Sequence, residues 1–288
     1  MSLGRIAFLA TLLLGPGARV TSAATILTDA NSRVTADDRN GMTVWRVNET
    51  ADNVFLSNYY IRIGGTGNER ALQDALGTPS IVKNGTNRVS LTYKNDILEA
   101  VVIYSLIGGP AGLFESRVNA SIALTNLSAS SLDLHLFQYS DFDLRFDQSN
   151  QRDQIRFLSR GSLIQHREGT DLGLLASVDT APTHYQSASS FLDFYFKFFL
   201  DQDGPTTLND TPGIGVLFPD PAVDSAFAFQ WDRSLASGET FRVGSLFQIT
   251  TVPEPSSLLL GLVGTAAVLA GGLRSVRARC SSGIGPRE

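Results

Sequence analysis

The sequence contains very little cysteine and lysine. Its one cysteine, Cys280, stands near the C-terminus of the 288-residue chain, so no disulfide can stabilise the region before it, and burial of a core must do so. The three lysines are Lys83, Lys94 and Lys197. Residues 25–251 contain 17 basic against 26 acidic residues, a net charge of −9. A region this acidic is a poor candidate for binding nucleic acid or anionic lipid.

Linear catalytic motifs are also missing. The three histidines show no metal-binding spacing such as His-Glu-x-x-His, and no serine stands in a Gly-x-Ser-x-Gly turn. Gly65-Thr66-Gly67 precedes a possible helix at 69–76, but Arg70 occupies the third small position of a dinucleotide loop, which favours a plain turn. We therefore predict that the chain is not an enzyme, with no catalytic residue and no cofactor.

Carboxylates are plentiful, and two alternatives to a solvated surface stay open. A pair among Glu99, Glu115 and Glu168 could hydrolyse a glycoside, although any chain of this length contains such residues. A structural Ca²⁺ could bind at Asp201 and Asp203, which flank a glycine turn but lack the later ligands of a calcium loop. Our prediction is no metal site, with these two aspartates as the weak candidates.

A second group of aspartates lies in the clearest alternation of the chain. Leucine and phenylalanine take one parity from 132 to 146, and Asp141, Asp143 and Asp147 take the other, with Asp153 nearby. The pattern predicts a strand with one core face and one wet face. Same-face neighbours on a strand lie about 7 Å apart, too far for two carboxylates to share one ion unless the chain bends. A solvated face is the prediction, and a structural Ca²⁺ at these aspartates stays open as the alternative.

Aromatic side chains offer a possible sugar-stacking platform, and the alternative is that they fill the core, because strands favour them. The candidates are Trp45, Trp231, Tyr59, Tyr60, Tyr104, Tyr139, Tyr185 and Tyr195. No pattern separates exposed rings from buried ones. The glycan-binding residues, if any, stay unknown at this point.

The region 25–251 is typical of an antiparallel β fold, because its apolar segments are short, alternate with period two and end at Gly, Asn, Asp or Ser. Asn84-Gly85 predicts a type I′ hairpin with 88–94 as one arm. Residues 97–107 are nearly all apolar and predict a central strand covered on both faces. Prolines between 205 and 221 predict a loop. About a dozen strands predict a two-sheet β-sandwich.

Both ends of the chain carry export signals. Residues 1–24 read as a cleaved signal peptide, with Arg5, an apolar stretch over 6–14 and small residues at 22–24. Residues 256–273 contain no charge, and a helix of that length spans about 27 Å, enough to cross a membrane with little tilt. The arginines that follow would lie in the cytoplasm, so the region 25–251 would lie outside.

Val252-Pro253-Glu254-Pro255, the glycine- and leucine-rich span and the arginine cluster together resemble the PEP-CTERM sorting signal of exopolysaccharide-producing Gram-negative bacteria. The resemblance covers 252–279 and implies processing by an exosortase-type enzyme. By resemblance, the recognition residues are Pro253, Glu254, Pro255, Arg274, Arg277 and Arg279. Residues 280–288 form a tail beyond the usual end of such signals. Residues 126–144, 228–231 and 235–241 are similar to uncharacterised PEP-CTERM ectodomains, which implies a sandwich and no activity.

These observations predict four parts: a signal peptide (1–24), a β-sandwich ectodomain (25–251), a sorting signal (252–279, with a helix over 256–273 and basic residues over 274–279) and a cytoplasmic tail (280–288). We expect an exported structural or interaction protein, anchored transiently in the inner membrane and then placed at the cell surface or in the extracellular matrix, linked to exopolysaccharide. The alternative is an exopolysaccharide-binding lectin or glycan-active enzyme on the same scaffold.

Overall fold

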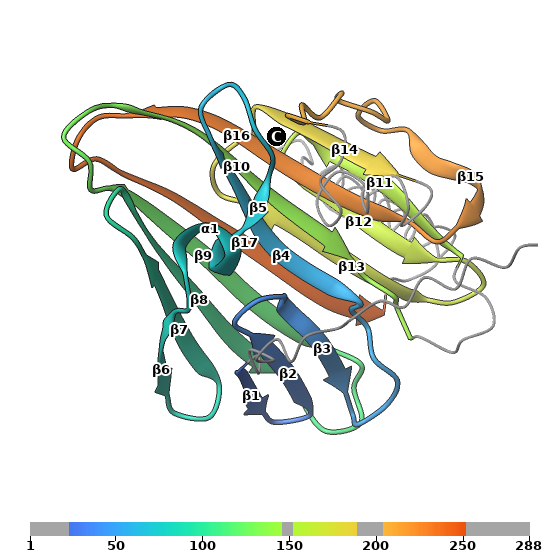
Figure 1. The fold of residues 1–288 in the computed structure, drawn as a ribbon. Helices are drawn as coiled ribbons and strands as arrows, with labels where there is room; N and C mark the ends of the chain where they lie inside the picture. Colours follow the sequence, from blue (N-terminus) through green and yellow to red (C-terminus); the bar gives the residue numbers. More distant parts are fainter. Residues whose placement is uncertain (1–22, 146–151, 189–203, 252–288) are drawn as a thin grey trace, which may run out of the picture.

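The computed structural model describes residues 23–145, 152–188 and 204–251. These residues form strands β1 to β17 and one short helix, α1 (Leu72–Leu76). The strands build two sheets that face each other (Figure 1). The predicted all-β sandwich is therefore confirmed. In the described ranges no helix has both the length and the apolar character needed to cross a membrane.

The first sheet has eight strands, in the order β1-β2-β3-β4-β10-β16-β14 with β5 paired to β4. They are β1 (Ala24–Asp29), β2 (Ser32–Asp37), β3 (Gly41–Val47), β4 (Leu56–Ile63), β5 (Arg70–Ala71), β10 (Leu132–Asp141), β14 (His184–Ala188) and β16 (Ala226–Leu235). Its pairs are antiparallel except the short β3–β4 contact, which is parallel. Gly41 is required there, because a Cβ would lie 2.3 Å from the carbonyl oxygen of Ser57.

The second sheet has nine strands, in the order β15-β11-β12-β13-β17-β9-β8-β7-β6. They are β6 (Ser80–Asn84), β7 (Arg88–Lys94), β8 (Leu98–Gly108), β9 (Ser116–Asn126), β11 (Asp153–Ser159), β12 (Ser162–Arg167), β13 (Leu172–Val178), β15 (Leu217–Val223) and β17 (Thr240–Thr251). Every pair in it is antiparallel, as the alternation predicted.

The core lies between the two sheets and is rich in aromatic rings. The Phe142 ring stacks 6.0 Å from that of Phe227 and contacts Trp45 edge-on at 6.1 Å, measured between centroids. Trp45 and Trp231 are 0% exposed. Burial of such large side chains supplies the main stabilisation of a domain that has no disulfide in its described part.

The outer face of the eight-stranded sheet carries a second, smaller core, formed by Leu56, Tyr60, Phe137, Tyr139, Ala188, Leu208, Ala226 and Ala228. Leu208 belongs to residues 206–211, which we call the covering segment. Its backbone is held by side chains of the structure beneath: the amide of Thr206 donates to Glu69 Oε1 and that of Leu208 to Gln230 Oε1, at 2.9 and 2.8 Å. Over β4, β10, β14 and β16, the outer face of this sheet thus carries a buried layer.

The outer face of the nine-stranded sheet is formed by half-buried and exposed residues instead of a second core. Along most of their length, strands β7, β8, β9 and β17 alternate between buried residues and half-buried or exposed ones. The buried residues point into the core, so the other set lies on the outer face. The predicted double covering of 97–107 is therefore wrong, because β8 has a single core face.

Other sequence predictions need correction in detail. The described strands outnumber the predicted dozen, because stretches with no strand prediction, among them 24–29, 32–37 and 184–188, also form strands. The hairpin at Asn84-Gly85 is confirmed, but Asn84 pairs with Arg88, so three residues connect the arms instead of two. The proline-rich loop is wrong over its last part, where 217–223 forms β15. This strand tolerates prolines because it lies at the edge of its sheet.

The predicted wet face of β10 is also wrong toward its C-terminal end. Asp141 is 3% exposed and Asp143 9%, so both are buried. The odd-numbered residues of β10 lie on the outer face of the eight-stranded sheet, and Phe137 and Tyr139 there belong to its second core. A segment distant in the sequence covers this face, so alternation along β10 could not reveal the burial.

Most of the predicted terminal signals lie outside the described residues. This applies to the span at 256–273, to the six recognition residues between 253 and 279, and to the signal peptide except its last two residues. Asp201, Asp203 and Asp147 lie outside as well. Strand β1 begins at Ala24, the last residue assigned to the signal peptide.

Candidate functional site

A hollow of about 500 Å³ lies on the outer face of the nine-stranded sheet, over β7, β8, β9, β17 and the end of β13. We call it the polar trough. Its polar side chains are Arg88, Ser105, Asn119, Ser121, Ser177 and Asp179, and its apolar ones include Ile103, Val178 and Leu246. No aromatic ring of the described chain lines it. Small hydroxyl and amide side chains therefore dominate its floor.

Strand register brings these residues together from five strands. Arg88 lies opposite Ser105, and Ser105 opposite Asn119. Asn119 in turn faces Leu246, which pairs with Ser177. At about 4.8 Å between neighbouring strands, this row spans about 19 Å across the sheet. The residues are far apart in the sequence, so no linear motif could have indicated them.

A second row contains Ile103, Ser121 and Gly244, and Asp179 lies at its end. The Gly244 amide donates to Asp179 Oδ1 at 2.8 Å, and the Asp179 amide donates to the Gly244 carbonyl at 2.9 Å. A Cβ at position 244 would lie 2.5 Å from Asp179 Oδ2. The glycine thus lets a carboxylate lie against the strand at the rim of the trough.

The charge of this face differs from that of the whole chain. Arg88, Arg117 and Arg242 are exposed and share the outer parity of β7, β9 and β17. Lys94 and Glu99, further along the same face, form an ion pair at 3.2 Å. The trough therefore lies among arginines on a protein whose formal net charge is −5.

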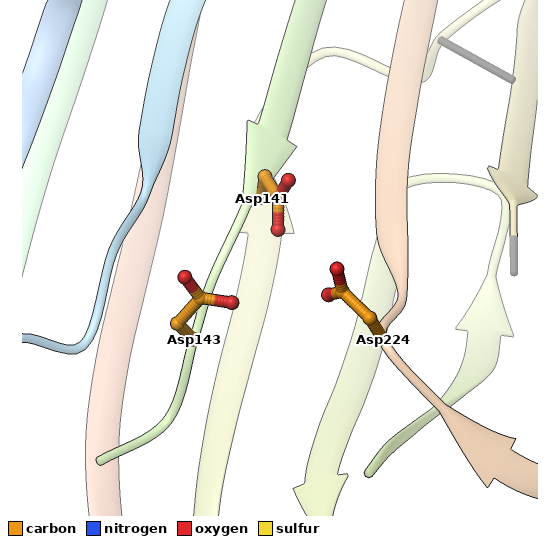
Figure 2. A group of neighbouring side chains, drawn as sticks. All are labelled: Asp141, Asp143 and Asp224. Atoms are coloured by element: carbon orange, nitrogen blue, oxygen red, sulfur yellow. The ribbon is translucent and has the colours of Figure 1, made fainter. Parts of the chain in front are cut away.

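Three carboxylates meet at the opposite side of the structure, where the two sheets are joined. Asp141 ends β10, Asp143 follows it, and Asp224 lies in the short link between β15 of one sheet and β16 of the other. Each offers one oxygen, and these oxygens all lie within 4.8 Å of one another. Figure 2 shows the three carboxylates pointing toward a common centre. We call this group the acidic cluster.

Burial and mutual repulsion both act on the acidic cluster. Burial is the largest cause raising the pKa of Asp141 well above its usual value, and the charges of Asp143 and Asp224 raise it further. Burial also raises the pKa of Asp224. Asp153, at the start of β11, is 2% exposed, and burial followed by the charge of Asp143 raises its pKa to about 8. The site strongly disfavours uncompensated negative charge.

The sequence indicated Asp141, Asp143 and Asp153 as neighbours but placed the first two on a wet strand face, too far apart to share an ion. The required bend exists, since β10 ends at Asp141. Asp224 was missed, because only the fold brings residue 224 to the end of β10. Its position just before the alternating segment 226–231 was the one available signal.

The aromatic platform considered as a possibility from the sequence is not formed by the described candidates. Trp45, Trp231, Tyr59 and Tyr139 are at most 1% exposed. Tyr60, Tyr104 and Tyr185 are also buried, and Tyr195 lies outside the described residues. The alternative, that these rings fill the core, is confirmed for the seven described ones.

Two histidines pair with carboxylates on the outer face of the eight-stranded sheet. His135 Nδ1 lies 2.6 Å from Asp232 Oδ1, and His184 Nδ1 lies 3.2 Å from Asp210 Oδ2. Asp210 belongs to the covering segment, and its Oδ1 also accepts the amide of Tyr185. The contacts of Asp210 fasten the covering segment to β14, and the His135–Asp232 contact joins β10 to β16, so both pairs have a structural role.

No protein-family model matches the chain, and no curated protein matches it. Solved structures do. A protein assigned as an aldose 1-epimerase from Escherichia coli K12 and a GalM/aldose epimerase homologue from C. elegans each give a TM-score of 0.52 at 9% identity, covering 81% of this chain and 100% of their own. A bacterial glucoamylase complexed with acarbose gives 0.52 at 11% identity, covering 87% of this chain and 36% of its own.

These likenesses concern the fold, and they overturn the prediction that the chain is not an enzyme. That prediction rested on missing linear motifs. The fold is shared with proteins named as aldose epimerases and a glucoamylase, so it is one that carries carbohydrate-converting enzymes. On a β-sandwich, side chains that lie far apart in the sequence can be brought together from several strands, so an active site requires no linear motif.

Proposed function

We propose that this protein binds carbohydrate in the polar trough. The observation that carries the proposal is the trough itself: a hollow of about 500 Å³ floored by hydroxyl, amide and carboxylate groups on an exposed sheet face. The shared fold of carbohydrate-active proteins supports it. The sequence had offered this function as the alternative to a purely structural protein, and the fold favours that alternative.

The chemistry of the lining suits a polyhydroxylated ligand. Ser105, Ser121 and Ser177 can each donate and accept, Asn119 does both through separate atoms, and Asp179 accepts. Ile103 and Leu246 supply apolar contact for the C–H faces of a sugar ring. With no aromatic ring in the described lining, hydrogen bonds would set the specificity in place of ring stacking.

The arginines on this face also support a particular class of carbohydrate as the ligand. Arg88 lines the trough, and Arg117 and Arg242 lie on the same sheet face. A guanidinium binds a carboxylate in a bidentate, charge-assisted way. We therefore propose an acidic polysaccharide as the ligand. Nucleic acid is disfavoured, because three arginines on an acidic chain supply few phosphate contacts.

The terminal signals expected from the sequence support a location of this function outside the cell. We propose that the chain is exported, held by its C-terminal span in the inner membrane, and processed by an exosortase-type enzyme at Pro253, Glu254 and Pro255. It would then act at the cell surface or in the extracellular matrix, where exopolysaccharide is the available ligand. Intact mass of the protein recovered from the medium tests this step: a chain running to Glu288 contradicts processing.

The binding experiment uses the full-length protein in mild detergent and titration calorimetry with acidic and neutral polysaccharides. The acidic polymer is expected to bind more tightly, and Arg88→Ala and Asn119→Ala to weaken binding at least tenfold. Thr92→Ala is the matched control, because Thr92 lies on the same face of β7 and does not line the trough. Release of reducing ends and change at the anomeric centre are followed in the same samples.

Equal affinity of wild type and both trough variants would contradict the trough as the site. Equal binding of neutral and acidic polymers would contradict the charge preference alone. Tighter binding of single-stranded nucleic acid than of any polysaccharide would overturn the proposed ligand class.

A further inference from the structure

We infer that the acidic cluster binds one Ca²⁺ ion, which joins the end of β10 to the link between β15 and β16. This site is distant in the fold from the polar trough and independent of the proposed carbohydrate binding. Its ligands would be carboxylate oxygens of Asp141, Asp143 and Asp224.

The geometry fits an ion of this size. Calcium–oxygen distances are about 2.3–2.6 Å, so two oxygens on opposite sides of one ion lie about 5 Å apart and others lie closer. The three oxygens of the acidic cluster lie within 4.8 Å of one another. Figure 2 shows the Asp141 carboxylate directed into the space between Asp143 and Asp224. Side-chain adjustment is therefore enough, and no movement of the strands is needed.

Unpartnered buried oxygens provide a second, independent observation. Asp141 is 3% exposed; its Oδ2 accepts from the Tyr139 hydroxyl at 3.0 Å, and its Oδ1 has no hydrogen-bond partner in the described structure. Oδ1 of Asp153 is buried and unpartnered in the same way. A buried carboxylate oxygen without a partner is costly, and a cation removes that cost.

Gln165 adds another oxygen beside the cluster. Its Nε2 donates to the carbonyl of Phe142, the residue between Asp141 and Asp143, at 2.5 Å. The side chain is 0% exposed, and its Oε1 has no partner among the described atoms. This amide oxygen, on a side chain that contacts the backbone between two of the cluster aspartates, is a further candidate ligand for a cation that takes six to eight oxygens.

In the described ranges, the protein's own cations fall short of balancing this charge. Arg167 acts on Asp153 through its charge, and its guanidinium also donates to the backbone carbonyls of Leu144 and Arg145. One such group cannot compensate four carboxyls. The oxygen-only ligand set favours a hard cation and disfavours zinc or copper, and the loosely spaced carboxylates favour Ca²⁺ over the smaller Mg²⁺.

Titration calorimetry of the full-length protein, first stripped with EGTA, tests the inference with CaCl₂ at neutral pH. One site is expected, with a Kd on the order of 10⁻⁴ to 10⁻³ M, as in extracellular calcium modules. Calcium should raise the melting temperature by several degrees, and magnesium by less. Asp141→Asn and Asp224→Asn should lower calcium affinity at least tenfold, whereas Asp96→Asn, an exposed aspartate remote in sequence, should leave it unchanged.

A luminescent probe keeps the test valid where a cluster variant folds poorly. Terbium binds calcium sites and emits when a nearby tyrosine is excited. Tyr139 contacts Asp141, so emission is expected in the wild type, displaced by calcium and lost in Tyr139→Phe with terbium affinity retained.

Two results would overturn the inference. The first is wild-type protein that shows neither heat nor a change in melting temperature with millimolar calcium, while Asp141→Asn and Asp224→Asn melt higher than wild type. The cluster would then be a set of protonated acids. The second is full calcium affinity in both variants, which would place the ion elsewhere in the chain.

Discussion

The outer faces of the two sheets differ: one is covered by another segment of the chain, and the other is accessible. The eight-stranded sheet is covered by residues 206–211 and carries a second core with Tyr60, Phe137 and Leu208. The nine-stranded sheet leaves its outer face accessible and holds the polar trough there. Both faces carry polar residues, but on the first they bind the covering segment, and on the second they line a hollow.

This difference indicates where function lies. Gln230 and Glu69 on the covered side direct side-chain oxygens to backbone amides of the same chain. In the trough, Ser105, Asn119 and Ser121 occupy a face that no described segment crosses, and their capacity for hydrogen bonds is available to another molecule. Polar side chains on the covered side should matter for stability, and those in the trough for binding.

The largest expected effect concerns the covered side. Arg62 and Glu69 form an ion pair at 2.8 Å with side chains 5% and 0% exposed, and Glu69 also accepts the Thr206 amide. Glu69→Ala leaves a buried guanidinium unpaired and should lower the free energy of unfolding by about 3–5 kcal/mol. Urea titration of the wild type and variant measures it.

Asp74→Ala is the matched control, because it breaks the exposed Arg39–Asp74 pair and should cost less than about 1 kcal/mol. Equal effects of the two substitutions would mean that the covering segment contributes no more than a surface contact. Carbohydrate binding should be unchanged in both variants.

The second-largest expected effect is a loss of folding stability at alkaline pH, caused by the buried tyrosines. Burial raises the pKa values of Tyr59, Tyr60, Tyr93, Tyr104 and Tyr139. Below about pH 10 the phenols are neutral in both states; above it the unfolded chain ionises first, so stability falls as pH rises. Each fully protected tyrosine contributes a loss of about 1.4 kcal/mol per pH unit.

Phenolate absorbance and urea unfolding as a function of pH measure this effect. Tyr60→Phe should reduce the slope, because one ionising group is removed from the covered face. Phenolate absorbance that appears near pH 10 while the protein remains folded would contradict the burial of these rings. No described tyrosine lines the trough, so binding there should survive until the protein unfolds.

Local patterns were enough to predict many of the strands but not what covers them. The strand 88–94 was predicted to the residue, because a hairpin and its alternation are encoded within a few positions. The burial of Asp141 and Asp143 depends on sequence-distant parts of the fold, and alternation could only assign them to a polar face. The polar trough likewise depends on the register between strands, and the acidic cluster depends on the link between the two sheets. The sequence of a single strand encodes neither.

The smallest effect on stability is expected for Gly244→Ala, and its comparison with Gly41→Ala should distinguish the roles of the two sheets most clearly. Gly244→Ala places a Cβ 2.5 Å from Asp179 Oδ2, the carboxylate at the rim of the trough. Asp179 is exposed and can move aside, so we expect a loss of about 1 kcal/mol or less in the free energy of unfolding, together with weakened polysaccharide binding.

Gly41→Ala is the counterpart in the eight-stranded sheet. Its Cβ would meet the Ser57 carbonyl at 2.3 Å with φ at +70°, so it should cost about 2 kcal/mol or more. Once folded, Gly41→Ala should bind polysaccharide normally. A Gly244→Ala protein that binds like wild type would remove Asp179 from the site.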